Sequence, residues 1–227
     1  MTAGDPELLA QGRAADVYDL GDGTVLRRYR TAHDTASEAK VMAWARAAGL
    51  PVPEVHRSDG PELVMDLAPG PTMLEDLGAH PWRMVHHARL LADLSAQVGR
   101  VRAPEWLATP PDVPAGGALL HLDLHPMNVI LSPEGPVLID WTNAARGEAD
   151  FDAAYSDVLM STFEVAGWKD RLGRRLLLAA FRGRRGRRQI ERHRRAACAR
   201  RLADANVTPG ERAALQRLLR RSAGRPG

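Results

Sequence analysis

The pattern of apolar and polar positions changes along the chain, from short runs to longer helical repeats. Residues 9–18 predict a strand, a loop and a second strand, and residues 24–29 predict a third. Asp22-Gly23 between two β-rich runs is a strong signal for a hairpin turn. Ser37–Trp44 follows as a helix, and Leu63-Val-Met65 has the character of a further strand. We expect a small sheet with one helix.

The later part of the chain has mainly helical periodicity. Residues 72–78 and 81–101 predict helices, and the second carries an apolar stripe on one face, formed by Met84, Ala88, Leu91, Ala92, Leu94 and Val98. Helices are also expected over residues 152–165, with Asp150 as N-cap, and over 187–205. A capping box, Thr208-Pro-Gly-Glu211, predicts the start of a last helix. Three short strands interrupt this pattern at residues 118–120, 129–131 and 137–139.

Length and composition limit the class of protein. The 227 residues are enough for two lobes. No apolar run approaches the length that spans a bilayer, and the first residues lack the cationic and apolar pattern of a signal peptide. Cys198 is the single cysteine, which excludes an internal disulfide and fits a reducing compartment. We expect a soluble cytoplasmic protein with no membrane partner.

Charge is distributed unevenly. Residues 165–227 hold 19 Lys+Arg and 4 Asp+Glu, whereas residues 1–164 hold 12 and 24. The acidic part favours a cationic substrate, although acidic surfaces also serve solubility. The Arg-rich segment 182–227 could contact nucleic acid, but it lacks interleaved aromatic residues and shows helical apolar spacing. We therefore expect packed helices with a solvated arginine face and no nucleic-acid partner.

One short segment carries the strongest chemical signal. His121-Leu-Asp-Leu-His-Pro-Met-Asn128 is followed twelve residues later by Asp140-Trp141, at the end of an apolar run. Pro126 interrupts a regular helix, which predicts a loop between the strands at 118–120 and 129–131. Asp123 could orient a reacting hydroxyl, and Asn128 and Asp140 could bind Mg²⁺ through hard oxygen atoms. These are the parts of a phosphoryl-transfer site.

The spacing matches the protein-kinase catalytic loop H-R-D-L-x-x-x-N at every specified position except the Arg, which is Leu122 here. Only the Asp of the magnesium motif D-F-G is present, as Asp140. With Leu138-Ile-Asp-Trp141 and Gly147-Glu-Ala-Asp-Phe-Asp-Ala-Ala154, the chain resembles the aminoglycoside phosphotransferase and choline kinase-like family over about residues 9–165. The resemblance implies an α+β, protein kinase-like fold of two lobes. The expected division is a nucleotide-binding lobe at 1–67 and a helical lobe at 68–227.

The resemblance also implies roles upstream of the catalytic loop. Gly12 occupies the place of a phosphate-covering loop, although a single glycine is equally typical of an ordinary turn. Arg27 takes the place of the strand lysine that contacts the phosphates, Glu38 is its helix partner, and Arg28 points to the opposite face. Arginine is not chemically equivalent to lysine, because its guanidinium is planar and forked. The backbone carbonyl of Asp66 and the N–H of Ala68 would pair with the adenine edge.

Further implied roles concern the catalytic loop itself. His121 is a structural residue that bonds the backbone near Asp140, and His125 lies near the phosphates or the acceptor. Asp152 braces the loop through hydrogen bonds. The implied cofactors are ATP or GTP and Mg²⁺, with a small-molecule hydroxyl as acceptor. The oligomeric state is open, and a homodimer that completes the acceptor pocket is one possibility.

Two other functions remain open from the sequence. Arg27 in place of lysine is compatible with a catalytically weak nucleotide-binding or regulatory protein of the same fold. His121, Asp123 and His125 form a His-x-Asp-x-His pattern that could bind zinc in a metal-dependent hydrolase.

Overall fold

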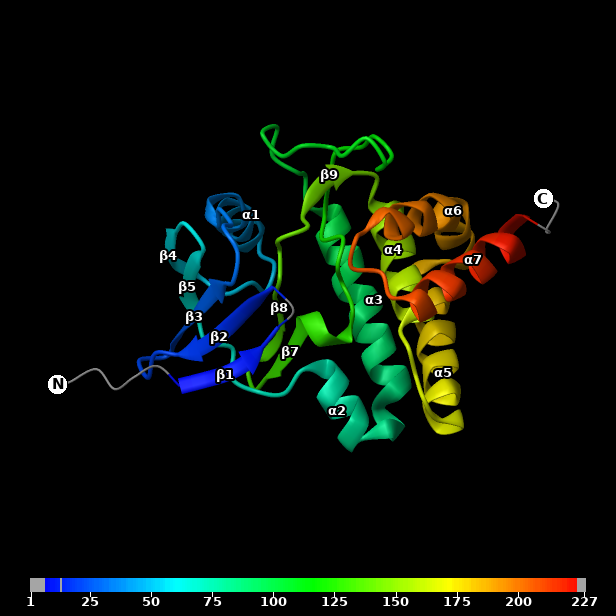
Figure 1. Cartoon of the computed structure of the whole chain (residues 1–227), viewed down its shortest axis with the longest axis horizontal. Coiled ribbons are helices and arrows are strands. Elements are labelled where there is room, and N and C mark those ends of the chain that lie inside the picture. The colour runs from blue at the N-terminus through cyan, green and yellow to red at the C-terminus, as the bar shows by residue number, and fades with distance from the viewer. Residues whose placement is uncertain (1–6, 13, 224–227) are drawn as a thin grey trace. The chain divides into compact units, whose positions relative to one another are not determined.

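The computed structural model describes residues 7–12 and 14–223. The chain forms two compact units (Figure 1). The first unit combines Met1–Pro71 with Ile130–Thr142, and the second combines Thr72–Val129 with Asn143–Gly227. The catalytic-loop segment and Asp140 therefore belong to different units.

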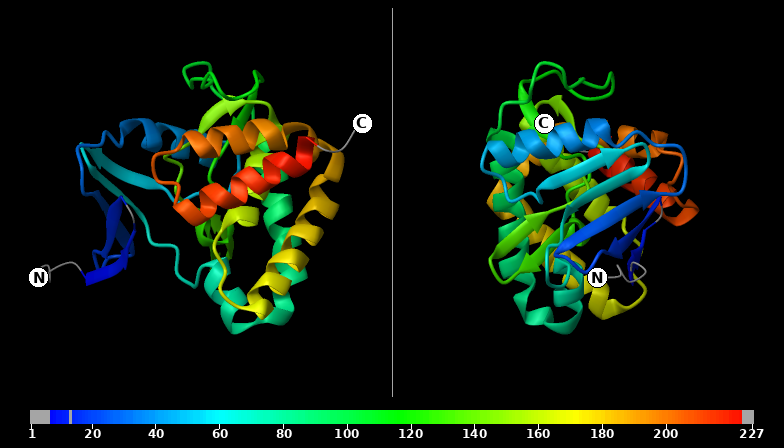
Figure 2. Two further views of the ribbon diagram at one scale, coloured as in Figure 1. Left: turned by 45° about the vertical axis from the view of Figure 1, so that its right-hand side comes forward. Right: turned by 90° about the vertical axis from the view of Figure 1, so that its left-hand side faces the viewer.

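The first unit contains a five-stranded antiparallel sheet in the order β1-β2-β3-β5-β4 (Figure 2). Its strands are β1 Glu7–Gln11, β2 Ala15–Asp19, β3 Thr24–Tyr29, β4 Val55–Asp59 and β5 Glu62–Asp66. The predicted strand at 24–29 and the hairpin before it are confirmed. Gly21 and Gly23 have φ of 75° and 87°, a region that favours glycine.

One helix and one hairpin complete the first unit. Helix α1, Ala36–Ala47, buries Val41, Met42 and Ala45, in agreement with the predicted helix after the first hairpin. Strands β7, Val129–Ser132, and β8, Gly135–Leu138, form a separate two-stranded sheet. Within this unit, the Leu138 N–H donates to the Pro51 carbonyl at 2.7 Å. The hairpin that carries Asp140 is thereby joined to the segment that precedes β4.

The second unit is mainly helical (Figures 1 and 2). Its elements are α2 Met73–Ala79, the 3₁₀ helices η1 Pro81–Arg83 and η2 Pro126–Asn128, α3 Met84–Arg100, β6 Ala118–Leu120, β9 Ala145–Gly147, α4 Ala149–Thr162, α5 Trp168–Arg185, α6 Arg187–Ala203 and α7 Pro209–Ala223. Helix α4 packs against α3, α5, α6 and α7. It is buried on nearly every side, and its buried residues include the polar side chains Asp152, Ser156 and Asp157 as well as apolar ones.

The start of α4 differs from the expected one. The helix begins at Ala149, and its N-cap is Glu148 rather than Asp150. Asp150 lies in the first turn, where a carboxylate is favoured by the helix dipole. Its side chain also lies 3.5 Å from the Arg185 guanidinium, so it is directed to a neighbouring helix.

The Arg-rich segment forms packed helices, as predicted, but many of its arginines are paired rather than solvated. Arg182 and Arg194 both contact Asp157, whose side chain is 1% exposed. Arg184 pairs with Asp93, Arg200 with Asp112, and Arg201 with Glu211. A buried carboxylate needs a compensating charge, and the segment supplies it. These five arginines therefore pair with acidic side chains of the second unit.

No helix within residues 7–12 and 14–223 has both the length and the apolar character needed to cross a membrane.

The buried carboxylate of Asp76 joins α2 to η1 and α3. It accepts hydrogen bonds from His87 at 2.6 Å, His80 at 2.8 Å and Arg83 at 2.9 Å. The bond from His87, with those from Arg83 and His80, outweighs burial and lowers the pKa of Asp76 to about 2. A carboxyl group whose folded-state pKa is depressed stabilises the fold above its unfolded pKa.

This contribution is present above about pH 4 and is lost as the pH falls toward 2. We expect Asp76→Asn to flatten the fall in melting temperature across that window, relative to the unsubstituted protein. Circular dichroism melts at several pH values would measure it, with Asp93→Asn, an exposed carboxylate of α3, as control. Equal slopes for the unsubstituted protein and Asp76→Asn would contradict the assignment.

Candidate functional site

The catalytic-loop residues lie together in the second unit, between β6 and β7. Leu122 has φ of 56°, an uncommon value for a residue with a side chain, so the loop turns sharply before Asp123. Pro126 occupies the first turn of η2, where its missing N–H costs nothing. The predicted loop between two short strands is confirmed, with one turn of 3₁₀ helix at its end.

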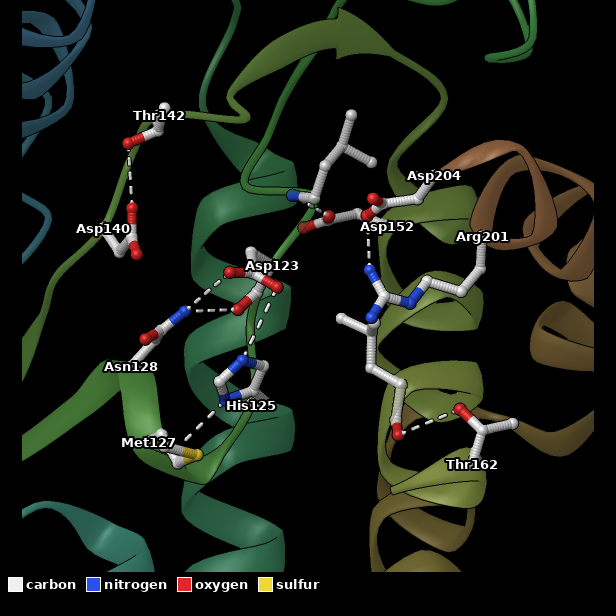
Figure 3. A network of polar contacts seen from close by, with 12 residues as sticks. Asp123, His125, Met127, Asn128, Asp140, Thr142, Asp152, Thr162, Arg201 and Asp204 are labelled. Carbon is white, nitrogen blue, oxygen red and sulfur yellow. Dashed lines mark hydrogen bonds and ion pairs between the residues drawn. The ribbon is translucent and has the colours of Figure 1, made fainter. Parts of the chain in front are cut away.

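Asn128 donates to Asp123 at two points (Figure 3). Its side-chain nitrogen lies 2.8 Å from the Asp123 carbonyl oxygen and 3.1 Å from the carboxylate atom Oδ2. Because the nitrogen is committed to Asp123, a cation could bind only the amide oxygen of Asn128. The Asp123 side chain is 25% exposed, so it is accessible to a hydroxyl group.

His125 lies beside the same carboxylate. Its Nδ1 atom accepts the Met127 N–H at 3.3 Å, and its Nε2 atom lies 3.5 Å from Oδ1 of Asp123. An accepting Nδ1 places the proton of a neutral imidazole on Nε2, toward Asp123. The role near the phosphates or the acceptor stays a prediction.

Asp152 of α4 holds the start of the loop. Its carboxylate accepts the Leu122 N–H at 2.7 Å and the His121 N–H at 3.2 Å. Burial raises the pKa of Asp152, while His121 and the two N–H groups oppose that shift. His121 is fully buried. The expected contact of His121 with the backbone near Asp140 would join the two units and stays a prediction.

In the first unit, Arg27 of β3 contacts two other predicted residues. Its guanidinium donates to Glu38 at 3.0 Å and to Asp140 at 2.9 Å. The Arg27 side chain is 12% exposed and that of Glu38 is 2% exposed. Arg28 lies on the opposite face, as strand alternation predicts, and pairs with Glu62. The pairing of Arg27 with Asp140 was not predicted.

Two further residues, Tyr29 and Thr142, contact Glu38 and Asp140 and were not predicted from the sequence. Tyr29 bonds Glu38 at 2.8 Å and Thr142 at 2.8 Å, and Thr142 donates to Asp140 at 2.9 Å (Figure 3 shows the last contact). Tyr29 lies two positions after Arg27, so period-2 alternation could have placed it on the same face. No sequence pattern indicated Thr142, because its contact with Asp140 depends on the backbone conformation of the residues that follow Asp140.

Gly12 lies in the tight connection between β1 and β2. Its N–H donates to the Ala15 carbonyl at 2.8 Å, and a Cβ added there would lie 2.9 Å from the same oxygen. Glycine is therefore required by the turn itself. Arg30 donates to the Gly12 carbonyl at 3.0 Å. A contact between this loop and phosphates stays a prediction.

Asp66 ends β5, and Ala68 follows it. The Asp66 carboxylate accepts the Glu54 N–H at 3.0 Å and a hydrogen bond from His56 at 2.8 Å, which joins the end of β5 to β4 and the residue before it. Gly70, with φ of 133°, lies so close to the Leu131 carbonyl that a Cβ would approach it to 2.3 Å. The adenine contacts of Asp66 and Ala68 stay a prediction.

The oxygen donors fit Mg²⁺ better than zinc. In the described parts of the chain, no three His, Cys, Asp or Glu side chains form a group able to hold a metal ion. The hydrolase alternative would need such a cluster around His121, Asp123 and His125. Mg²⁺ needs only one or two protein oxygen ligands when phosphates and water complete its shell. Asp140, whose side chain is 30% exposed, and the amide oxygen of Asn128 are of that type.

The small antiparallel sheet with one helix and the mainly helical unit define a protein kinase-like fold, as predicted. A family profile described as the phosphotransferase enzyme family matches residues 56–194. The match covers more than half of the chain and includes Asp123, Asn128, Asp140 and Asp152. The chain belongs to the phosphotransferase enzyme family. No curated protein matched the sequence.

Solved structures of the same fold come from two groups of kinases. A complex of aminoglycoside phosphotransferase APH(4)-Ia with AMP-PNP and hygromycin B aligns with a TM-score of 0.69 and 15% identity, covering 98% of this chain and 95% of that one. A choline/ethanolamine kinase family protein from Mesorhizobium loti aligns with a TM-score of 0.56 and 18% identity, covering 97% and 87%. Plasmodium vivax ethanolamine kinase aligns with a TM-score of 0.60 and 11% identity, covering 98% and 83%.

Proposed function

We propose that the protein transfers the γ-phosphoryl group of ATP to a hydroxyl group of a small molecule. Asp123 orients that hydroxyl and accepts its proton. Asn128 and Asp140 bind Mg²⁺, and Arg27, oriented by Glu38, contacts the phosphates. Gly12, His125 and the backbone of Asp66 and Ala68 complete the nucleotide site.

The observation that carries the proposal is the hydrogen bonding of Asn128 to Asp123 within a family match that also contains Asp140. That bond orients the carboxylate and leaves the amide oxygen of Asn128 as the atom that would bind Mg²⁺. A bound Mg²⁺ would neutralise charge on the phosphate oxygens. Positioning and electrostatics supply most of the rate in such transfers, so small shifts of these residues would be costly.

The acceptor is proposed by class only. Structures of the same fold include complexes with hygromycin B, gentamicin and streptomycin and an ethanolamine kinase, and all four of these compounds are amino-bearing alcohols. A cationic acceptor of that kind is compatible with the proposal. The acidic residues of the second unit give it little support, because Asp93, Asp112 and Asp157 are paired with arginines.

A nucleotide-depletion screen tests this function. Consumption of Mg-ATP, and of Mg-GTP in parallel, would be followed over aminoglycosides, amino alcohols, sugars and nucleosides. We expect acceptor-dependent turnover with the unsubstituted protein and a loss of turnover with Asp140→Ala. Arg28→Lys, on the opposite face of β3, is the control. Full turnover by Asp140→Ala would show that the metal assignment is wrong.

The alternative of a catalytically weak nucleotide-binding protein draws on one observation, the pairing of Arg27 with Asp140. Both functions require that Mg-ATP raises the melting temperature through ligand linkage. Binding without turnover over the whole acceptor panel would favour the alternative. An unchanged melting temperature with millimolar Mg-ATP would contradict both.

A further inference from the structure

Five side chains of the first unit form a closed circuit of polar contacts, which we call the Arg27 ring. From Arg27 it runs to Glu38 at 3.0 Å, to the Tyr29 hydroxyl at 2.8 Å, to Thr142 at 2.8 Å, to Asp140 at 2.9 Å and back to Arg27 at 2.9 Å. Strand β3, helix α1 and the segment after β8 each contribute. The ring therefore ties three parts of the unit to one carboxylate.

The forked shape of the Arg27 side chain suits this position. Nη1 donates to Glu38 and Nη2 donates to Asp140, so two different nitrogen atoms hold two different carboxylates. The guanidinium carbon also lies 4.9 Å from the centre of the Tyr29 ring. A lysine ammonium would have to donate to both carboxylates from one nitrogen atom, so it cannot keep them as far apart as the two guanidinium nitrogens do.

Tyr29 and Thr142 close the other side of the ring. Burial and the neighbouring Glu38 raise the pKa of Tyr29, so its hydroxyl keeps its single proton, which it can donate to Glu38 or to Thr142 but not to both at once. Thr142 donates to the same oxygen of Asp140 that Arg27 contacts. Two donors on one oxygen restrict the rotation of the carboxylate.

Asp140 needs such restraint because of its backbone. Its φ is 63°, in the left-handed region that disfavours residues with a side chain. Conformations of this kind persist where the surroundings over-determine them, and they cluster at functional sites. At Asp140, the hydrogen bonds from Arg27 of β3 and from Thr142 restrain the residue in this way.

We propose that Tyr29 and Thr142 are positioning residues that hold Asp140 in the orientation that binds Mg²⁺, and that arginine at position 27 is required to close the ring. This inference rests on the proposed function. It goes beyond that function by assigning roles to Tyr29 and Thr142, which have none in it.

Nucleotide binding with and without Mg²⁺ separates positioning from general support. The affinity for AMP-PNP would be measured by calorimetry in the presence and absence of Mg²⁺, for Tyr29→Phe, Thr142→Val and the double variant. We expect each single substitution to reduce the Mg²⁺-dependent gain in affinity about tenfold, the usual size for a group that orients a metal ligand. Metal-free affinity should stay unchanged. The double variant should lose no more than either single, since each opens the same circuit.

Two conservative substitutions complete the test. Thr142→Ser keeps the hydroxyl and should keep most of the Mg²⁺-dependent gain in nucleotide affinity. Arg27→Lys should lose that gain, although lysine is the more usual residue of the family at this position. Arg28→Lys should keep the gain.

Three results would overturn the inference. Lower melting temperatures with an unchanged Mg²⁺-dependent gain would leave Tyr29 and Thr142 with a structural role only. Full Mg²⁺ dependence in Arg27→Lys would refute the requirement for arginine. A lack of nucleotide binding by the unsubstituted protein would refute the proposed function and this inference with it, and that result is recognisable because it appears before any substitution.

Discussion

Asp123→Asn is expected to lower kcat for phosphoryl transfer by about 10²–10⁴-fold, the usual contribution of a positioned general base. The amide has nearly the shape of the carboxylate but cannot accept the proton of the acceptor hydroxyl. Asn128 can still donate to the backbone carbonyl of residue 123, now at 2.8 Å, so the loop should keep its form. The KM for Mg-ATP should therefore change little.

Steady-state kinetics with the best acceptor from the depletion screen would measure this effect. Asp93→Asn is the matched control, because Asp93 is an exposed carboxylate of the same unit that pairs with Arg184. Turnover close to that of the unsubstituted protein would show that Asp123 is not the base. A large rise in KM with unchanged kcat would assign it to binding instead.

Asp152→Ala is expected to lower the free energy of unfolding by about 2–4 kcal/mol. The substitution leaves the buried N–H groups of His121 and Leu122 without their acceptor, at a cost of about 1–3 kcal/mol each. Removing a buried carboxylate, whose pKa is raised by burial, offsets part of that loss. Leu122 should then leave its unusual backbone conformation, so turnover should fall as well.

Urea unfolding followed by circular dichroism would measure the change in stability. Asp150→Ala is the control, because it lies in the first turn of the same helix and its pair with Arg185 is partly exposed. We expect about 1 kcal/mol or less for that variant. Equal losses for the two variants would show that the N–H groups of the loop find other acceptors.

Local patterns predicted much of the fold and many candidate residues. The Asp22-Gly23 turn, the strand at Thr24–Tyr29 and the placement of Glu38 in the next helix follow from short-range periodicity and turn chemistry. The order of the loop residues from His121 to Asn128 was informative because the kinase template fixes their spacing.

Contacts between distant segments were harder to predict. Arg27 and Asp140 are 113 residues apart, and no pattern in either segment indicates their pairing. The arginines of α5 and α6 were expected on a solvated face, because a charge run does not reveal that a buried acid such as Asp157 lies opposite. Asp150 resembled an N-cap, but Glu148 takes that place.

The central claim is that Asp123 and Asp140 meet around one magnesium nucleotide. Crystals grown with Mn²⁺ and AMP-PNP would test it directly, because the anomalous signal of manganese locates the ion. We predict one ion at the nucleotide phosphates, bound by the Asp140 carboxylate and the Asn128 amide oxygen, with Asp123 facing the γ-phosphate. An ion bound away from either residue, or a nucleotide remote from Asp123, would contradict the account.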